Sequence, residues 1–426
     1  MNITFVMPKS SPGLLRVRYL RMPPLGLLTL ASATPSSWDI RIVDENIEEL
    51  DYMPSDIVAI SVTTAVASRA YSIADLYKSK GATVILGGVH PSAMPKEAIA
   101  HADSVVIGEA DIIWKKVLSD FQQGKLKKFY KGARPAGSEI PVIKRELVSR
   151  KYFFRNLVQS LRGCPNSCDF CAVSHFNGRL IRPRPIERVL EEARSFRGKR
   201  ILDKYFLFAD DNIMASPANA ESLFKAIKPL ELYWGSQASL NLAKNQRLLK
   251  LAADSGCKVL FCGFESLSQK SLAEVGKPYE TANYRTLARR IHDHGIAIEG
   301  SFIYGFDNDD KTVFRNTVDF CNEISLDLAQ FTVLTPFPGT SLFQRLKAQN
   351  RIVTYDWSLY DAFHVVYQPK NISAAELRNG MLWSYDHFYS YSNIAKRALA
   401  TRTRIGFRNA MLMTVANFDF RKFRLI

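Results

Sequence analysis

Three closely spaced cysteines lie in the stretch Arg162-Gly163-Cys164-Pro165-Asn166-Ser167-Cys168-Asp169-Phe170-Cys171. Their spacing is Cys-x3-Cys-x2-Cys, and they follow a short strand-like run, residues 157–161. Three thiolates can hold three irons of a [4Fe-4S] cluster and leave the fourth iron open to a small chelating ligand. The spacing therefore predicts an iron–sulfur centre at the end of a strand, with Cys164, Cys168 and Cys171 as its ligands.

Two other interpretations of these cysteines are open. Cys-x2-Cys is common in zinc sites, but zinc usually takes a fourth protein ligand, and the nearby candidate is His175. A disulfide framework is disfavoured because the chain is long and its six cysteines come without a secretory signal. Cys257, Cys262 and Cys321 stand in separate predicted elements, so we interpret them as buried free thiols rather than as ligands of a second cluster.

Length and composition suit a multidomain globular protein. The chain has 426 residues, 47% of them hydrophobic, and no uncharged apolar run approaches the roughly 20 residues that span a bilayer. We expect four parts: an N-terminal domain at 1–135, a linker at 136–150, a barrel at 151–348 and a C-terminal extension at 349–426. The expected location is the cytoplasm.

The net charge of +16 is unevenly spread. Residues 144–200 hold 14 Lys and Arg against 5 Asp and Glu, and residues 395–426 hold 8 against Asp419 alone. Basic excess around the cysteines and the C-terminus favours an anionic partner, such as an acidic electron-donor protein, a phosphate-bearing substrate, nucleic acid or a membrane surface. A solvated basic face is an equally open interpretation.

The first 130 residues alternate β-branched runs with helical stretches, which predicts an α/β fold with a doubly wound parallel sheet. The candidate strands are 3–6, 39–43, 57–62, 82–86 and 104–107. Loops rich in glycine and polar residues follow them, and in such sheets the ligand crevice lies at the carboxyl ends of the strands. Glycines in these loops let the backbone approach a large ligand closely.

Motifs in these loops resemble the cobalamin-binding domain of the B12-dependent radical S-adenosylmethionine (SAM) enzymes, many of which are methylases. They are Pro-Leu-Gly at 24–26, Gly-Gly-x-His-Pro at 87–91 and Gly-Glu at 108–109. The cysteine spacing, together with Phe170, is similar to the radical SAM signature itself. By this resemblance the cobalamin contacts are Pro24, Leu25, Gly26, Ser61, Thr63, Gly87, Gly88, His90, Gly108 and Glu109.

One motif of other cobalamin proteins, Asp-x-His-x-x-Gly, is missing from the sequence. It supplies a histidine to cobalt, and many B12-dependent radical SAM enzymes also lack it, so the resemblance implies cobalamin without a protein histidine on the metal. His90 has two interpretations: a substitute ligand, or a loop histidine that packs against the corrin or caps a turn.

From about 150 to 348 the alternation continues with longer helices. Candidate strands are 157–161, 204–209, 232–238, 258–264, 296–304 and 328–334, and candidate helices are 186–196, 218–227, 242–253, 283–294 and 311–324. Six such units, with the cysteines after the first strand, predict the partial (β/α)6 barrel of a radical SAM core. Reactive groups are expected at the C-terminal ends of these strands.

Polar motifs at those strand ends resemble the SAM-binding motifs of the same enzymes. Residues 210–212, Asp-Asp-Asn, stand where much of the superfamily has Gly-Gly-Glu, so Asp210 or Asp211 is expected to pair with the ammonium of SAM. By resemblance, Ser239 and Glu265 are candidates for the ribose and carboxylate of SAM, and Gly305 lies where the family lays backbone against adenine. Singly, each motif also has a plain interpretation as a helix cap or a salt-bridge partner.

The C-terminal region is aromatic and then basic. Residues 355–397 resemble the C-terminal extension of the hopanoid C-methylase group, with a helix expected at 374–388. Its aromatic residues either line an apolar substrate channel or pack a small, mainly helical cap. Projected as one helix, residues 402–426 place Arg404 and Arg408 near Val415, so apolar and basic faces do not separate, which argues against an interfacial membrane helix.

The resemblance implies an enzyme with a [4Fe-4S] cluster, SAM and methylcobalamin that methylates an unactivated carbon of a hydrophobic, lipid-like small molecule through a 5′-deoxyadenosyl radical. It also implies a flavodoxin- or ferredoxin-type electron donor, and the basic C-terminus keeps peripheral contact with the inner face of the membrane open. No nucleic-acid partner is expected.

The alternatives are oxidation, cyclisation or carbon–carbon bond formation without net methyl transfer, methylthiotransferase-like RNA modification, and a non-enzymatic cobalamin or SAM sensor. Cys164 is the first cysteine of the chain, whereas methylthiotransferases carry a second cluster on three N-terminal cysteines. No recognisable DNA-binding motif supports the sensor.

Overall fold

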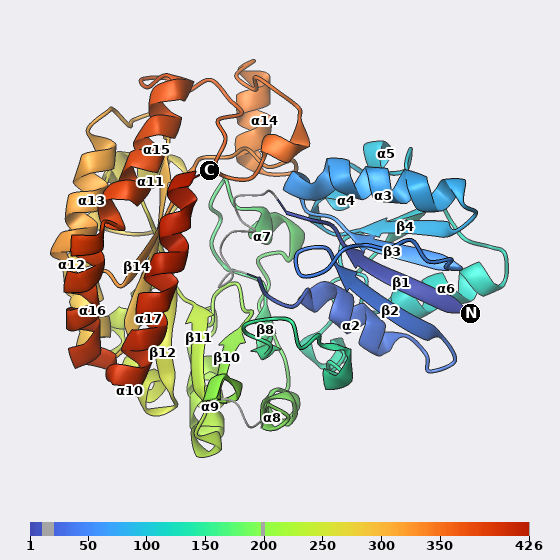
Figure 1. Ribbon diagram of the computed structural model, residues 1–426, viewed down its shortest axis with the longest axis horizontal. Coiled ribbons are helices and arrows are strands. Elements are labelled where there is room, and N and C mark those ends of the chain that lie inside the picture. Colours follow the sequence, from blue (N-terminus) through green and yellow to red (C-terminus); the bar gives the residue numbers. More distant parts are fainter. Residues whose placement is uncertain (11–20, 197–200, 426) are drawn as a thin grey trace.

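The computed structural model describes residues 1–10, 21–196 and 201–425, and it contains two large parallel sheets (Figure 1). The first sheet, on the right in Figure 1, has the order β2-β1-β3-β4-β5-β6. Its strands are β1 Asn2–Met7, β2 Asp39–Asp44, β3 Ile57–Ser61, β4 Thr83–Gly87, β5 Ser104–Ile107 and β6 Phe129–Lys131. Only β6 lacks a counterpart among the predicted runs, because its exposed-buried-exposed pattern covers just three residues.

Side chains along the first sheet alternate between two apolar cores. Ile57 and Ala59 pack with helices α2 (Leu25–Ala33) and α6 (Trp114–Gln122), whereas Val58 and Ile60 pack on the opposite face with α3 (Ala67–Ser79). The shorter helices α4 (Val89–Ala93) and α5 (Pro95–Ala98) follow β4. A parallel sheet covered by helices on both faces is doubly wound, which confirms the fold predicted for this part of the chain.

The second sheet has the order β14-β13-β12-β11-β10-β7, again with parallel pairs. Its strands are β7 Leu157–Val158, β10 Tyr205–Phe208, β11 Tyr233–Gln237, β12 Cys257–Glu265, β13 Ala297–Tyr304 and β14 Leu328–Val333. Its helices are α8 Ile186–Arg194, α9 Pro217–Ile227, α10 Gln246–Asp254, α11 Gln269–Glu274, α12 Tyr284–Asp293, α13 Val313–Glu323 and α14 Ser341–Ala348. Neighbours in the sheet are neighbours in sequence, which confirms the predicted partial barrel.

The first predicted barrel strand, 157–161, is divided in the structure. Only β7 joins the barrel sheet, while β8 (Leu161–Arg162) pairs antiparallel with β9 (Arg182–Pro183). Between them the amide of Ser160 donates to the carboxylate of Asp210 at 2.6 Å, which takes the backbone out of the sheet ladder. The cysteines therefore lie in the connection between the two strands of this ribbon, rather than directly after the barrel strand.

The C-terminal region folds as α15 (Ala374–Phe388), α16 (Tyr391–Ile405) and α17 (Phe407–Phe420), which flank the barrel on the left of Figure 1. Most of its aromatic residues are core residues, and the buried ones are Trp357, Tyr360, Phe363, Tyr367, Tyr385, Phe388 and Tyr389. This favours the helical-cap interpretation over a substrate channel. Within the described residues, no helix is both long and apolar enough to cross a bilayer.

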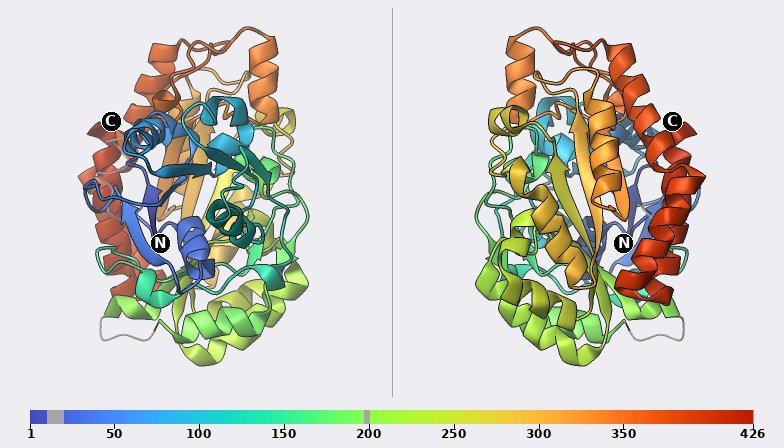
Figure 2. Two further views of the ribbon diagram at one scale, coloured as in Figure 1. Left: turned by 90° about the vertical axis from the view of Figure 1, so that its right-hand side faces the viewer. Right: turned by 90° about the vertical axis from the view of Figure 1, so that its left-hand side faces the viewer.

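The two sheets are held together by buried polar contacts. Tyr152 donates to Asp44 at 2.6 Å. Trp357 of the C-terminal region donates its indole N–H to Glu97 at 2.8 Å and packs in one of the apolar cores of the first sheet. In the left view of Figure 2, the first sheet and its helices lie in front of the barrel. The boundaries at 135, 150 and 348 stay a prediction.

Candidate active site

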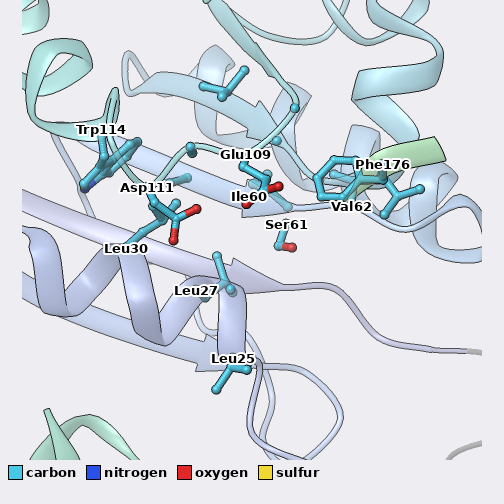
Figure 3. Close-up of a pocket in the computed structure, with 18 of the residues that line it drawn as sticks. Leu25, Leu27, Leu30, Ile60, Ser61, Val62, Glu109, Asp111, Trp114 and Phe176 are labelled. Atoms are coloured by element: carbon cyan, nitrogen blue, oxygen red, sulfur yellow. The ribbon is translucent and has the colours of Figure 1, made fainter. Parts of the chain in front are cut away.

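A crevice of about 300 Å³ opens at the carboxyl edge of the first sheet (Figure 3). Leu27 of α2, Ser61 at the end of β3 and Glu109 after β5 come from three elements and face the same space. The sequence-predicted residues that line it are Leu25, Gly26, Ser61, Thr63, Gly87, Gly88, Gly108 and Glu109. Ligand crevices of open α/β sheets lie at this edge, because the loops that follow parallel strands converge there.

The loop after β4 shows why glycine is needed at the crevice. Gly88 has a φ of +108°, and a Cβ placed on it would lie 2.8 Å from the carbonyl oxygen of Val62. A side chain there would thus be strained and would also push apart two loops of the crevice. Gly108, with a φ of +83°, similarly approaches the carbonyl oxygen of Gly132.

The inner part of the crevice is apolar and lies between the first sheet and helices α2 and α6. Its walls include Leu30, Ala59, Ile85, Val106 and Trp114. An apolar slot beneath glycine-rich loops suits a bulky cofactor with a flat, largely apolar portion, so these residues fit the predicted cobalamin.

Two predicted cobalamin contacts lie elsewhere. His90 is fully buried, with its Nδ1 3.3 Å from the hydroxyl of Thr64 and its Nε2 3.3 Å from Glu97, and it does not line the crevice. Its ring packs edge-on against Trp357, and burial lowers the pKa of the imidazole despite the neighbouring Glu97 carboxylate. His90 is therefore a core histidine that braces α4 against the C-terminal region and does not face the crevice. Pro24 stands just before α2, outside the crevice lining.

The three cysteines line a second cavity of about 140 Å³ at the C-terminal ends of the barrel strands. Burial raises the pKa of all three thiols, that of Cys168 to about 11. Within the described residues, no three His, Cys, Asp or Glu side chains converge as a single metal ion requires. The thiols share one cavity without converging on one point, which suits a cluster whose irons each bind one thiolate better than a single zinc ion.

His175, the candidate fourth zinc ligand, does not face the cysteine cavity. It lines a third cavity of about 470 Å³ on the other side of helix α7 (Ala172–Phe176), and its ring lies close to Gly339. This placement removes the nearby histidine that a zinc loop would have needed.

Glu265 enters the cysteine cavity at the end of β12 and pairs with Lys277. The ammonium Nζ of Lys277 lies 2.7 Å from Oε1 of Glu265, and both side chains are about nine-tenths buried. Glu265 has a φ of +63°, and its carboxylate folds back over Gly263, where a Cβ would meet it at 2.2 Å. Burial acts to lower the pKa of Lys277, but the negative charge of Glu265 outweighs it and the pKa is raised, so the ammonium stays charged.

The two aspartates after β10 have different surroundings. Asp210 is fully buried outside both cavities and accepts hydrogen bonds from the amides of Ser160 and Leu161; burial raises its pKa to about 7. Asp211 lines the cysteine cavity, where it accepts from the amide of Gly163 at 3.2 Å and the side chain of Asn177 at 2.9 Å. Of the two, only Asp211 is placed to meet a ligand in that cavity.

Ser239 also lines the cysteine cavity, and its hydroxyl accepts from the phenol of Tyr279 at 2.8 Å. Its amide donates to the side chain of Asn212. Phe170 forms part of the same wall. Gly305 does not: its amide donates to Asp309 and its carbonyl accepts from Tyr367, so both backbone groups are engaged in the core.

Helix α7 separates the two cavities. It begins directly after Cys171, and its Val173 and Ser174 line the cysteine cavity while its Phe176 lines the crevice. Figure 1 shows α7 between the barrel and the first sheet. One short element thus touches the predicted SAM site on one side and the predicted cobalamin site on the other.

A buried charge network fixes the cysteine loop to the crevice. Arg162, two residues before Cys164, donates to Glu109 at 2.6 Å and to Asp111 at 2.8 Å. Arg182 donates to the other oxygen of Glu109 at 2.5 Å. These groups are nearly inaccessible, and charge pairs of this kind hold their geometry because leaving either partner unpaired is costly.

Lys277, Tyr279, Arg162 and Asp111 were missed by the sequence reasoning. The turn Gly276-Lys277 packs closely against the cysteine loop. Gly276 has a φ of +68°, and a Cβ on it would lie 3.4 Å from the carbonyl oxygen of Ser167. The amide of Asp169 also donates to Val275 at 3.0 Å, so this turn is tied to the cysteines. In the sequence, the pair Gly276-Lys277 is the signal that could have pointed to this lysine.

Two family models match the chain. The Radical SAM superfamily matches residues 158–321, and the B12 binding domain matches residues 12–118. These segments contain the cysteine cavity and most of the crevice, respectively.

Curated relatives and a solved structure agree with these models. The chain is 32% identical over 403 residues to a bacteriochlorophyllide d C-12(1)-methyltransferase of Chlorobaculum tepidum, which covers 92% of this chain and 88% of the relative. It is 26% identical to a hopanoid C-2 methylase of Rhodopseudomonas palustris, over 79% of this chain and 66% of that protein. The fold is similar to that of the radical SAM methyltransferase TsrM from Kitasatospora setae, solved with cobalamin and a [4Fe-4S] cluster, with a TM-score of 0.68 and 16% identity over 82% and 75% of the two chains.

Proposed function

The chain belongs to the cobalamin-dependent radical SAM methyltransferases, and we propose that it methylates a carbon atom of a hydrophobic, multi-ring small molecule. The observation that carries the proposal is the position of α7, whose two sides line the cysteine cavity and the crevice. A substrate held beside α7 would be within reach of both cofactor sites. The names of two relatives, which act on a bacteriochlorophyllide and on hopanoids, support a large apolar ring system as substrate.

The family's cofactors are a [4Fe-4S] cluster, SAM and cobalamin, which supply a carbon-centred radical and a transferable methyl group when bound. The protein's part is to hold and orient them and to exclude water. Cys164, Cys168 and Cys171 would ligate the cluster. Asp211 is proposed to meet the ammonium of SAM and Lys277 its carboxylate, because opposite charges at the wall of a buried cavity give strong, directional hydrogen bonds.

The test is an anaerobic reaction of the cobalamin- and iron-loaded protein with SAM, a reductant, and either a bacteriochlorophyllide or a hopanoid. The expected product is substrate heavier by one CH₂ group, formed together with 5′-deoxyadenosine. Deoxyadenosine with oxidised, cyclised or coupled product of other mass would instead support radical chemistry without methyl transfer.

We also propose a flavodoxin- or ferredoxin-type electron donor and a location in the cytoplasm. Support for the donor comes from the basic excess of residues 144–200, since such donors are acidic and long-range attraction speeds their encounter. Reduction of the cluster by flavodoxin should slow as ionic strength rises, whereas a rate independent of salt would argue against this type of donor.

A further inference from the structure

The helices α16 and α17 form an antiparallel hairpin with an unusual outer face. On α17, Phe407, Met411, Val415 and Phe418 are 66%, 55%, 52% and 46% exposed. Their spacing of four, four and three residues puts them on one side of the helix, opposite the buried Ala410, Met413, Ala416 and Phe420. The exposed side of α17 is therefore apolar, like its buried side.

Helix α16 continues this face. Tyr391 and Leu399 are 66% and 67% exposed. They are eight residues apart, as Phe407 and Val415 are on α17. The hairpin joins them into one surface, because the ring of Tyr391 lies 6.3 Å from that of Phe418 at one end and the guanidinium of Arg402 lies 5.6 Å from the ring of Phe407 at the other. We call this surface the hairpin face.

The concentration of apolar groups there is not an average property of the surface. Of the fifteen large hydrophobic residues exposed in the described chain, six lie on this hairpin. Contiguous apolar surface on a water-soluble protein marks a contact site more often than scattered single residues do. The hairpin face thus calls for a partner.

The charge around the hairpin face identifies the kind of partner. Exposed cations lie on the same hairpin, namely Lys396, Arg402 and Arg408, and Lys422 follows it directly. Asp419 is the one acidic residue between 391 and 426, and it pairs with Lys422. A second copy of the chain would bring an identical set of cations against these, which is unfavourable, whereas an anionic surface would be attracted.

The position of the hairpin argues against the electron donor as that partner. Arg404, close to the turn between the two helices, donates to the carbonyl of Ser325 at 3.0 Å, just before β14 begins. The hairpin turn therefore lies at the N-terminal ends of the barrel strands, opposite the end that carries the cysteines. An electron donor must approach the cluster, so this surface is poorly placed for it.

We propose that the hairpin face docks the enzyme on an anionic lipid bilayer, with the apolar stripe inserted at the level of the headgroups and the flanking cations on lipid phosphates. An apolar stripe bordered by Lys and Arg is the pattern of interfacial helices that lie in the plane of a membrane. This goes beyond the methyl transfer proposed above and stands or falls separately from it.

The test is flotation of the full-length chain with vesicles of phosphatidylcholine containing about 30% phosphatidylglycerol, compared with phosphatidylcholine alone. We expect binding to the anionic vesicles that weakens with salt. The double variant Met411→Glu, Phe418→Glu should bind at least about tenfold more weakly, since it puts two charges into the inserted stripe. Val353→Glu, which changes an equally exposed residue (59%) outside the hairpin, should bind as the wild type does.

The iron content and the melting temperature of each variant show whether it is folded. If the double variant misfolds, the double variant Arg402→Gln, Arg408→Gln replaces it. Its preference for anionic over neutral vesicles should be smaller than that of the wild type. Absence of wild-type binding would overturn the proposal. Equal vesicle binding by all folded variants would also overturn it. So would a concentration-dependent dimer that is lost in the Met411→Glu, Phe418→Glu variant, if the wild type does not bind vesicles.

Discussion

The ammonium of Lys277 lies 2.7 Å from Oε1 of Glu265 within the cavity that the three cysteines line. The two residues belong to different elements, one at the end of β12 and the other in the turn after α11. Replacing either one alone would leave an uncompensated buried charge, so the pair acts as a unit. Its place beside Cys168 lets Lys277 also reduce the negative charge that the thiolates accumulate.

Lys277→Met should weaken the binding of SAM by at least about tenfold, the equivalent of one hydrogen bond to a charged group. The measurement is calorimetric titration of SAM into iron-loaded protein, with iron content as a check on the cluster. Lys270→Met, on the exposed side of α11, is the matched control and should bind SAM normally. Equal affinity in both variants would remove Lys277 from the SAM site.

Replacing any one of Cys164, Cys168 and Cys171 by Ala should abolish SAM cleavage and lower the iron content from about four per chain toward zero, because these three thiols are the proposed protein ligands of the cluster. Iron analysis and deoxyadenosine formation measure the two effects. Cys321→Ala changes a fully buried thiol in α13 and should retain both. Cleavage by any of the three loop variants would contradict the ligand assignment.

Gly88→Ala should lower cobalamin binding and destabilise the protein by about 2 kcal/mol, because it combines a strained φ with a close backbone approach. Cobalt content after loading and the melting temperature are the readouts. Gly81→Ala separates the two causes: Gly81 has a similar φ of +87°, but a Cβ on it would meet nothing within 4 Å. If Gly81→Ala loses as much cobalt as Gly88→Ala, the close approach at the crevice is not the reason.

Glu299→Gln should stabilise the protein at pH 8 but not at pH 4. Burial raises the pKa of Glu299 on β13 to about 7, although a hydrogen bond from Gln330 partly offsets it. The unfolded chain loses this proton near its ordinary pKa of about 4.3, so the wild type loses stability as pH rises from there to about 7.

Glutamine is neutral at every pH and avoids that loss. The gain at pH 8 should reach at most about 4 kcal/mol, since a tenfold change in proton affinity corresponds to about 1.4 kcal/mol. Melting temperatures of the variant and the wild type across this range measure it. A difference between the two that does not change with pH would show that Glu299 is ionised in the folded state.

Local patterns carried much of the fold and of the candidate site. Each useful pattern spans a short stretch of sequence: the cysteine spacing, the glycine-rich loops, or the alternation of strands and helices. Together these patterns indicated both sheets and both cavities. They succeed because ligand spacing, backbone freedom at glycine and the side-chain period of strands are properties of adjacent residues. The division of 157–161 was missed because it depends on Asp210, about fifty residues away.

What the sequence by itself determined is thus the order of the elements, the three cysteines that share one cavity and the loops that meet at each sheet edge. Only the tertiary structure decided which side chains face the cavities: Asp211 rather than Asp210, Lys277 from a distant turn, and His90 turned into the core. It also removed Arg404 from the apolar side of the tail, because the chain breaks at Gly406, with a φ of +79°, and directs Arg404 toward the barrel. The physical reason is the same in each case: the direction of a side chain is set by the elements packed against it, and those come from remote parts of the chain.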